Sequence, residues 1–401
     1  MTNYIILVLC LVVLISYIFD ITSKYSKIPS VILLILLGIG LHILTERIGL
    51  KIPDLNPFLP ILGTLGLVMI VMEASLDLKL GRQKISLIKK SFSAAFFLFV
   101  ILVFILTAIE VNFFGYPLFD SLLNAIPLGI ISSAVALSSA NHLTREQKEF
   151  IVYESSLSDI VGILIFDYIL ISKSSVGNGA FNFVLYGVLT IIIAITMTAG
   201  LAILLHKTRY HINYVIIMTS VVMVYIMAKL SHLPALFLVL VFGVVLSNYK
   251  LFEKTIVDRY VDFEKFKNDV DSFRKILSEL TFIVRSFFFI IFGYSIKLAN
   301  LFVLDNIIVG ISITVLIFIL RWLFFSQVLK LSSVRLILFA PRGLITILLF
   351  LSIPAVNRVH IINEEVITIV ILLSMATMMV GNFFPGNDNG KSMGIDESSY
   401  S

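Results

Sequence analysis

Six consecutive residues, Glu154-Ser155-Ser156-Leu157-Ser158-Asp159, place two carboxylates and three hydroxyls in an otherwise apolar run that extends to about Ser172. Carboxylate and hydroxyl oxygens are the ligands that hard cations prefer. A charged carboxylate at the centre of a membrane-spanning helix costs roughly 2.5–3.5 kcal/mol, so acids inside a bilayer usually mark ion or proton pathways. If this run spans a membrane, Asp159 is therefore the first functional candidate.

The composition indicates a polytopic membrane protein. Hydrophobic residues make up 59% of the 401, charged residues only 14%, and the mean hydropathy is +1.05, whereas soluble proteins have about 25% charged residues. The lone cysteine, Cys10, excludes a disulfide framework and a thiolate metal site. Phosphate-binding glycine loops, dinucleotide fingerprints and nucleophile elbows are missing from the sequence. We therefore expect neither an enzyme nor a bound cofactor.

Apolar runs separated by charged or turn residues predict about thirteen transmembrane helices. Loops that are odd-numbered from the N-terminus, together with the C-terminal tail, carry 21 lysines and arginines, and even-numbered loops carry six. Because basic residues gather on cytoplasmic loops, the N-terminus is predicted outside and the C-terminus in the cytoplasm. The runs are about 3–20, 29–46, 57–77, 91–113, 119–141, 149–172, 180–206, 211–228, 232–249, 278–296, 301–327, 332–353 and 363–384.

The thirteen runs divide into two inverted six-helix repeats, at about 1–172 and 211–384, within one transmembrane domain over 1–384. Spans five and twelve occupy corresponding positions. Span twelve contains Phe339-Ala340-Pro341-Arg342-Gly343, whose proline and glycine weaken a helix. Span five contains Ser132-Ser133-Ala134, which is either a matching interruption or a set of small residues that pack between close helices. Paired interruptions of this kind indicate the midplane site of a secondary transporter. Residues 250–276 form a charged amphipathic segment, either on the cytoplasmic membrane surface or packed on the protein, and 385–401 are predicted to be a short disordered tail.

Helical rise assigns depths to the buried charges. Asp159 falls about 15 Å into span six, near the midplane, and its i−4 neighbour Ser155 shares its face. Glu154 falls about 7 Å in, at the level of Arg321 in span eleven, so the two either form an ion pair or reach water separately. Arg342 lies halfway through span twelve. Two further candidates are Glu73 in span three and Arg285 in span ten. Glu73 is either functional or simply solvated near the inner interface, and Arg285 either takes part in transport or pairs with a structural partner.

With these motifs in order, the chain resembles the monovalent cation:proton antiporter family, the sodium/proton exchangers, over nearly its whole length. The family carries Glu-Ser-x-x-Asn-Asp in span six, Thr-Asp-Pro in a broken span five, an arginine in span eleven and Arg-Gly in span twelve. The matching positions here are Glu154, Ser155, Ser158 and Asp159; Ser132, Ser133 and Ala134; Arg321; and Arg342-Gly343.

The resemblance implies that Asp159 binds the cation and the proton in turn and that Ser155 helps to hold Na⁺, with Ser132, Ser133 and Ser158 as further ligands. It also implies a Glu154–Arg321 pair in the core and a homodimer serving pH homeostasis. Ser158 replaces the family asparagine and Ser133 the family aspartate, so a weaker affinity or an altered ion preference is expected. A single site carboxylate favours one-for-one, electroneutral exchange.

Two other functions stay open. A sodium-coupled symporter of a small organic anion would use a related fold, and a transport-inactive membrane sensor would tolerate the two serine replacements. The expected partners are a monovalent cation, protons and membrane lipid, with no nucleic acid. The short tail and the missing targeting segment favour a bacterial inner membrane.

Overall fold

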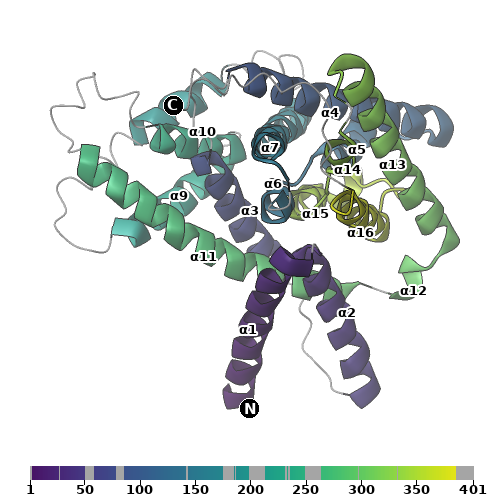
Figure 1. The fold of residues 1–401 in the computed structure, drawn as a ribbon, viewed down its shortest axis with the longest axis horizontal. Coiled ribbons are helices and arrows are strands. Elements are labelled where there is room, and N and C mark those ends of the chain that lie inside the picture. Colours follow the sequence, from purple (N-terminus) through teal and green to yellow (C-terminus); the bar gives the residue numbers. More distant parts are fainter. Residues whose placement is uncertain are drawn as a thin grey trace. The chain divides into compact units, whose positions relative to one another are not determined.

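The fold of this protein was obtained as a computed structural model, in which the described residues are overwhelmingly helical (Figure 1). No strand occurs in those residues, so the predicted all-α class is confirmed. They are 2–26, 28–49, 58–77, 85–140, 143–174, 185, 187–197, 213–230, 233, 235–248, 263–296, 298–331 and 333–384.

The long helices follow the predicted apolar runs. Six helical stretches of the described chain are long and apolar enough to cross a membrane, and a helix at 187–197 lies within the seventh predicted run, so the count of thirteen spans stays a prediction. The continuous helices are α1 (Thr2–Ser26), α2 (Ser30–Ile48), α3 (Phe58–Asp77), α4 (Ile85–Phe114), α7 (Arg145–Ser174), α9 (Asn213–Leu230), α10 (Ala235–Ser247), α11 (Phe263–Ser295), the short α12 (Leu298–Leu301), α13 (Leu304–Leu323) and α16 (Glu364–Gly381).

Spans five and twelve are both broken, as their sequences predict. Span five consists of α5 (Leu118–Gly129) and α6 (Ser133–Ser139), separated by extended residues 130–132. Span twelve consists of α14 (Val334–Leu338) and α15 (Leu344–Ser352), separated by residues 339–343. Pro341 cannot donate to a helix and Gly343 is fully extended, with φ −168° and ψ −139°, so the second interruption follows directly from its sequence.

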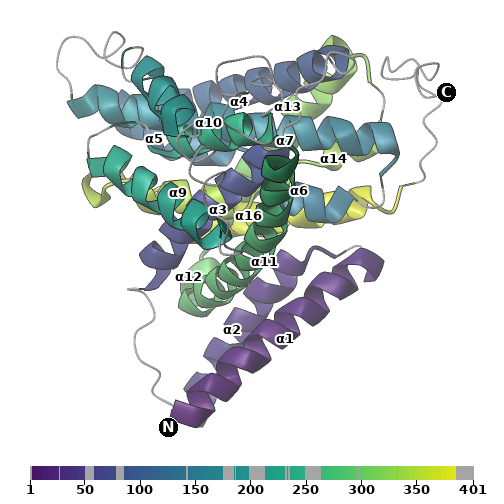
Figure 2. The same cartoon turned by 90° about the vertical axis from the view of Figure 1, so that its left-hand side faces the viewer.

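The chain divides into two compact units. The first unit comprises 1–64, 82–162 and 283–401 and contains both broken spans; the second comprises 65–81 and 163–282. In the first unit α4 packs along α5, and α13 packs along α16 (Figure 1). Figure 2 shows α1 and α2 side by side in this unit. In the second unit α9 packs on α10, and the Ser247 hydroxyl of α10 donates to the carbonyl of Leu76 at 2.7 Å.

Helix α11 includes part of the predicted amphipathic segment. It runs unbroken from Phe263 to Ser295, so 263–276 are continuous with the tenth predicted span. Val270 and Phe273, two apolar residues of the segment, are buried. The first half of the segment, 250–262, and the predicted disordered tail, 385–401, lie outside the described residues.

Two glycines let α2 and α11 approach backbone to backbone in the first unit. A Cβ on Gly38 would collide with the carbonyl oxygen of Ile290, and a Cβ on Gly293 would collide with that of Ile35. Small residues are the usual means of bringing membrane helices close together. Beside this contact, Thr45 Oγ1 lies 3.2 Å from Tyr294 Oη.

Gly38→Ala should destabilise the protein by about 1–3 kcal/mol, because backbone atoms of α11 have to move to admit the methyl group. Gly40→Ala, two residues along the same helix, is the matched control, since a Cβ there meets nothing within 4 Å. The helix preference of alanine should leave Gly40→Ala unchanged or slightly stabilised. Thermal unfolding in detergent measures both, and equal melting temperatures for the two variants would contradict the close approach.

Candidate ion-binding site

The two helix breaks meet each other. The backbone N–H of Ser132 donates to the carbonyl oxygen of Pro341 at 2.9 Å, joining the interruption of span five to that of span twelve. Inside a membrane every backbone polar group freed by a break needs a partner, and non-helical backbone is tolerated only where protein surrounds it. Residues 130–133 and 339–343 are all buried, so this crossing meets that requirement through protein contacts.

Arg342 satisfies carbonyl groups at the crossing. Its Nε donates to the carbonyl of Leu128 at 3.0 Å, near the C-terminus of α5, and its Nη1 donates to that of Ala340 at 2.9 Å. Its own backbone N–H donates to the Ser374 hydroxyl of α16 at 3.0 Å. A helix C-terminus carries partial negative charge and stabilises a cation. The arginine predicted halfway through span twelve thus caps the broken helix of span five.

Arg321 caps the broken helix of span twelve. Its Nε donates to the carbonyl of Leu336 at 3.0 Å, and its Nη2 donates to that of Phe339 at 3.1 Å, both at the C-terminal end of α14. The guanidinium lies 4.5 Å from the centre of the Phe325 ring. Each interrupted span therefore has one arginine that donates to carbonyls at the C-terminal end of its first half-helix.

Glu154 and Arg321 form a bidentate ion pair. Arg321 Nη1 lies 2.5 Å from Glu154 Oε1, and Nη2 lies 2.7 Å from Oε2. Both side chains are fully buried, Glu154 at 0% and Arg321 at 1% exposure, so the alternative in which each reaches water separately does not apply. The pair connects α7 to α13 and, through the carbonyls of α14, to the second break.

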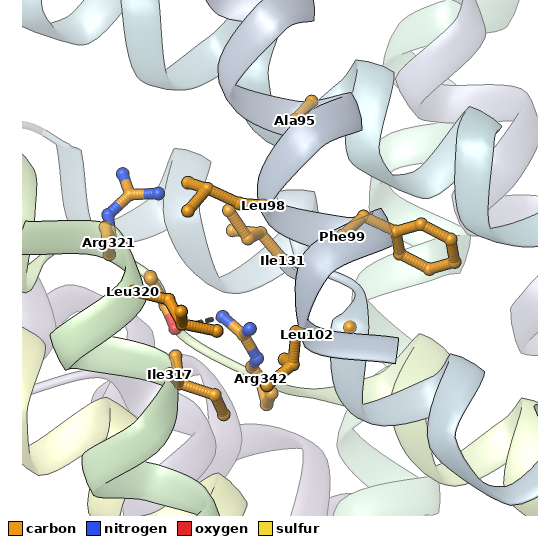
Figure 3. Close-up of a pocket in the computed structure, with 11 residues that line it drawn as sticks. Ala95, Leu98, Phe99, Leu102, Ile131, Ile317, Leu320, Arg321 and Arg342 are labelled. Atoms are coloured by element: carbon orange, nitrogen blue, oxygen red, sulfur yellow. Dashed lines mark hydrogen bonds between the residues drawn. The ribbon is translucent and has the colours of Figure 1, made fainter. Parts of the chain in front are cut away.

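A small cavity lies between the two arginines. It measures about 20 Å³ and is lined by Arg321, Arg342 and apolar side chains of α4 and α13 (Figure 3). This volume suffices for about one water molecule. The cavity is too small for a larger solute.

Asp159 has no hydrogen-bond partner in the described structure. Its carboxylate is 3% exposed, and both of its oxygens are buried without a bond to a described residue. The hydroxyl and the backbone N–H of Ser133, at the start of α6, lie within interaction range but form no hydrogen bond of ordinary geometry. The hydroxyls of Ser132 and Ser133 are also buried and unbonded. A buried carboxylate with unsatisfied oxygens requires a proton or a cation to compensate its charge.

The other two predicted ligands on α7 have different partners. The Ser155 hydroxyl donates to the carbonyl of Ile151, one turn earlier, at 2.7 Å, and keeps lone pairs for a further contact. The Ser158 hydroxyl accepts the N–H of Ile131, in the first break, at 3.0 Å. Ser158 therefore fixes α7 to the crossing, and this contact is the one that the structure shows for it.

The amino-acid sequence also matches a known protein family. The profile of the family described as "sodium/hydrogen exchanger, transmembrane" matches residues 9–384, which is nearly the whole chain. The chain belongs to this family. No curated protein sequence matches the exchanger.

Solved structures show the same fold. One, of the sodium proton antiporter MjNhaP1 from Methanocaldococcus jannaschii at pH 8, is similar to this exchanger with a TM-score of 0.72 and 18% identity, covering 94% of this chain and 98% of that one. An electron-microscopy structure of MjNhaP1 is similar with a TM-score of 0.68 and 17% identity, covering 95% of this chain and 94% of that one. The exchanger is therefore an integral membrane protein with an antiporter fold.

The two lesser candidates stand apart from this cluster. Glu73 is half-buried on the part of α3 that belongs to the second unit. Arg285 is half-buried on α11 in the first unit, and the contacts at the crossing do not include it. Their roles in the exchanger stay predictions.

Sequence reasoning missed Ser374 and Glu110. Ser374 accepts the backbone N–H of Arg342, and its only sequence signal was a hydroxyl in an apolar run. Glu110 is buried in α4 with both carboxylate oxygens unbonded to described residues, and its signal was a lone acid in the fourth run. The carbonyl groups that hold the two arginines have no sequence signal at all.

Proposed function

We propose that this protein exchanges a monovalent cation, Na⁺ foremost, for protons, and that both ions compete for Asp159. The observation that carries the proposal is the buried Asp159 carboxylate, unbonded and beside Ser133, where α7 meets two broken helices. Occupation by either ion compensates the carboxylate charge, and occupation by one excludes the other. Membership of the sodium/hydrogen exchanger family supports the same chemistry.

Oxygen atoms for a cation are present around Asp159. The hydroxyls of Ser132 and Ser133 are buried and unbonded, and Ser155 keeps lone pairs while it donates to Ile151. Hydroxyl and carboxylate oxygens suit a hard monovalent ion. We propose Asp159 and Ser155 as the principal Na⁺ ligands, with Ser132 and Ser133 completing the shell and Ser158 contributing through the crossing that it fixes.

The surrounding charges fit a site with one exchangeable proton. Glu154 is neutralised by Arg321, and the guanidinium of Arg342 is held by two carbonyl groups. Asp159 is then the one carboxylate at the crossing whose charge is uncompensated by a described residue. We therefore propose one-for-one, electroneutral exchange, in a homodimer whose N-terminus is outside and whose C-terminus is cytoplasmic, in a bacterial inner membrane.

Proton flux across the liposome membrane tests the proposal. Purified protein is reconstituted around a pH-sensitive dye, and Na⁺, Li⁺ or K⁺ is added outside under an imposed pH gradient. We expect Na⁺ to move protons outward from an acidic lumen, with no change when the membrane potential is clamped. Protein-free liposomes are the control.

Other outcomes of the liposome experiment would indicate a different function. Sodium uptake that requires an added organic anion would indicate symport, and an absence of ion-driven proton flux would indicate a sensor. A reversal current in voltage-clamped liposomes would contradict electroneutral exchange while leaving exchange itself intact.

A further inference from the structure

A large groove lies on the outer surface of the first unit, away from the helix crossing. Its volume is about 800 Å³, and its walls come from α13, α14, α16 and the π-helical turn η5 (Phe324–Val328) that extends α13. Two of these helices, α13 and α16, pack side by side (Figure 1). The lining residues are Thr314, Val315, Phe318, Ile319, Trp322, Ser326, Lys330, Leu331, Val334, Ile337, Leu338 and Thr377.

The groove is apolar along most of its length and cationic at one end. Val315, Ile319 and Trp322 recur every three to four residues and are each about half exposed, so they form one continuous apolar face of α13. Ser326 and Lys330 follow at the end of the helix. No acidic side chain is present among the residues that line the groove. The occupant that fits is long and apolar, with an anionic group at one end.

The backbone at the cationic end is unusual in two ways. The chain passes from α13 into a π-helical turn, so the N–H of Leu329 donates to the carbonyl of Phe324, five residues back. Lys330 then adopts φ +53°, the one positive φ of a non-glycine residue in the described chain. π-turns and left-handed non-glycine residues cost energy and gather at functional sites. Here they place a lysine at the end of the groove.

We propose that this groove binds an anionic phospholipid, with an acyl chain along the exposed face of α13 and the lipid phosphate on Lys330. The exposed surface of a membrane protein meets lipid, and a phospholipid combines the two chemistries that the groove presents. Tryptophan and lysine at the end of a transmembrane helix are typical of the headgroup level, and basic pockets between such helices bind anionic headgroups. The proposal requires a membrane setting but not ion exchange.

Trp322 makes the proposal directly measurable, because it is the only tryptophan of the chain. The protein is reconstituted in phosphatidylcholine vesicles in which part of the lipid is acyl-brominated, either as phosphatidylcholine or as phosphatidylglycerol. Bromine quenches indole fluorescence on contact, so quenching reports lipid in the groove. We expect phosphatidylglycerol to associate about fivefold more strongly than phosphatidylcholine, the preference that one lysine near an anionic headgroup provides.

Substitutions at Lys330 separate the headgroup contact from general lipid contact. Lys330→Gln should lose the preference and keep the quenching by phosphatidylcholine, while Lys330→Arg should keep both. Lys148→Gln, an exposed lysine on α7, is the matched control and should retain the preference. In the unmodified protein, raising the ionic strength should reduce the preference, because salt screens the lysine.

Several results would overturn the proposal. Equal quenching by the two lipids, or a preference that survives in Lys330→Gln, would remove the phosphate contact. Weak quenching by both would show that protein covers the groove, for example a second copy of the chain. A preference abolished by millimolar inorganic phosphate would indicate a site for free phosphate and not for a phospholipid.

Discussion

Asp159→Asn should abolish Na⁺-dependent proton flux in liposomes. The amide cannot take up or release a proton, and the replacement removes the negative charge that attracts the cation. Loss of one partner from a buried charge pair typically costs about 3–5 kcal/mol, so Na⁺ affinity should fall by about 100-fold or more. Because the Asp159 oxygens form no hydrogen bond of ordinary geometry with a described residue, removing the carboxylate charge should cost the fold little.

The unfolding temperature of Asp159→Asn should therefore be unchanged or higher than that of the unmodified protein. Such a gain at the expense of activity is the usual behaviour of a strained functional group. Asp167→Asn is the matched control, since it makes the same replacement eight residues later in α7, where the side chain is half-buried. It should keep the flux. Flux that persists in Asp159→Asn, in a protein that is still folded, would remove Asp159 from the exchange reaction.

The breaks in spans five and twelve could be predicted from the sequence, because their cause is local. Pro341 and Gly343 weaken a helix wherever they occur, and clustered serines in span five offer hydroxyls to a backbone that has lost helical partners. The approach of Glu154 to Arg321 could also be anticipated, since helical rise alone sets the depth of each. Local rules and the bilayer thickness together define these features.

The roles of the arginines as helix caps could not be predicted, because they depend on which helices are neighbours in space. Arg342 contacts Leu128, which is 214 residues away in sequence, and the acceptor is a backbone carbonyl that any residue would supply. Ser158 illustrates the same limit. Ser158 lies four residues after Glu154, so helical phase alone puts the two on one face, but the bond from the N–H of Ile131 to its hydroxyl depends on where the break lies.

Breaking the Glu154–Arg321 pair should destabilise the protein more than any other single polar replacement at the crossing. Glu154→Gln leaves a buried guanidinium without its counter-charge, and Arg321→Met leaves a buried carboxylate without its own, at about 3–5 kcal/mol each. Arg321→Met also removes the side-chain donor to the buried carbonyl of Phe339, which adds about 1–3 kcal/mol for that group, whereas the carbonyl of Leu336 keeps the backbone N–H of Phe339. Arg321→Met should therefore be the worse variant.

A double-mutant cycle separates these contributions, with thermal unfolding in detergent as the measurement. Glu154→Gln combined with Arg321→Met removes both charges, so the double variant should be more stable than the sum of the single effects predicts. It should not return to the unmodified level, because the carbonyl of Phe339, just after α14, still lacks its side-chain donor. Strictly additive effects would contradict a direct pair. Full recovery would show that the carbonyl contacts contribute nothing, and that α14 does not depend on Arg321 for its cap.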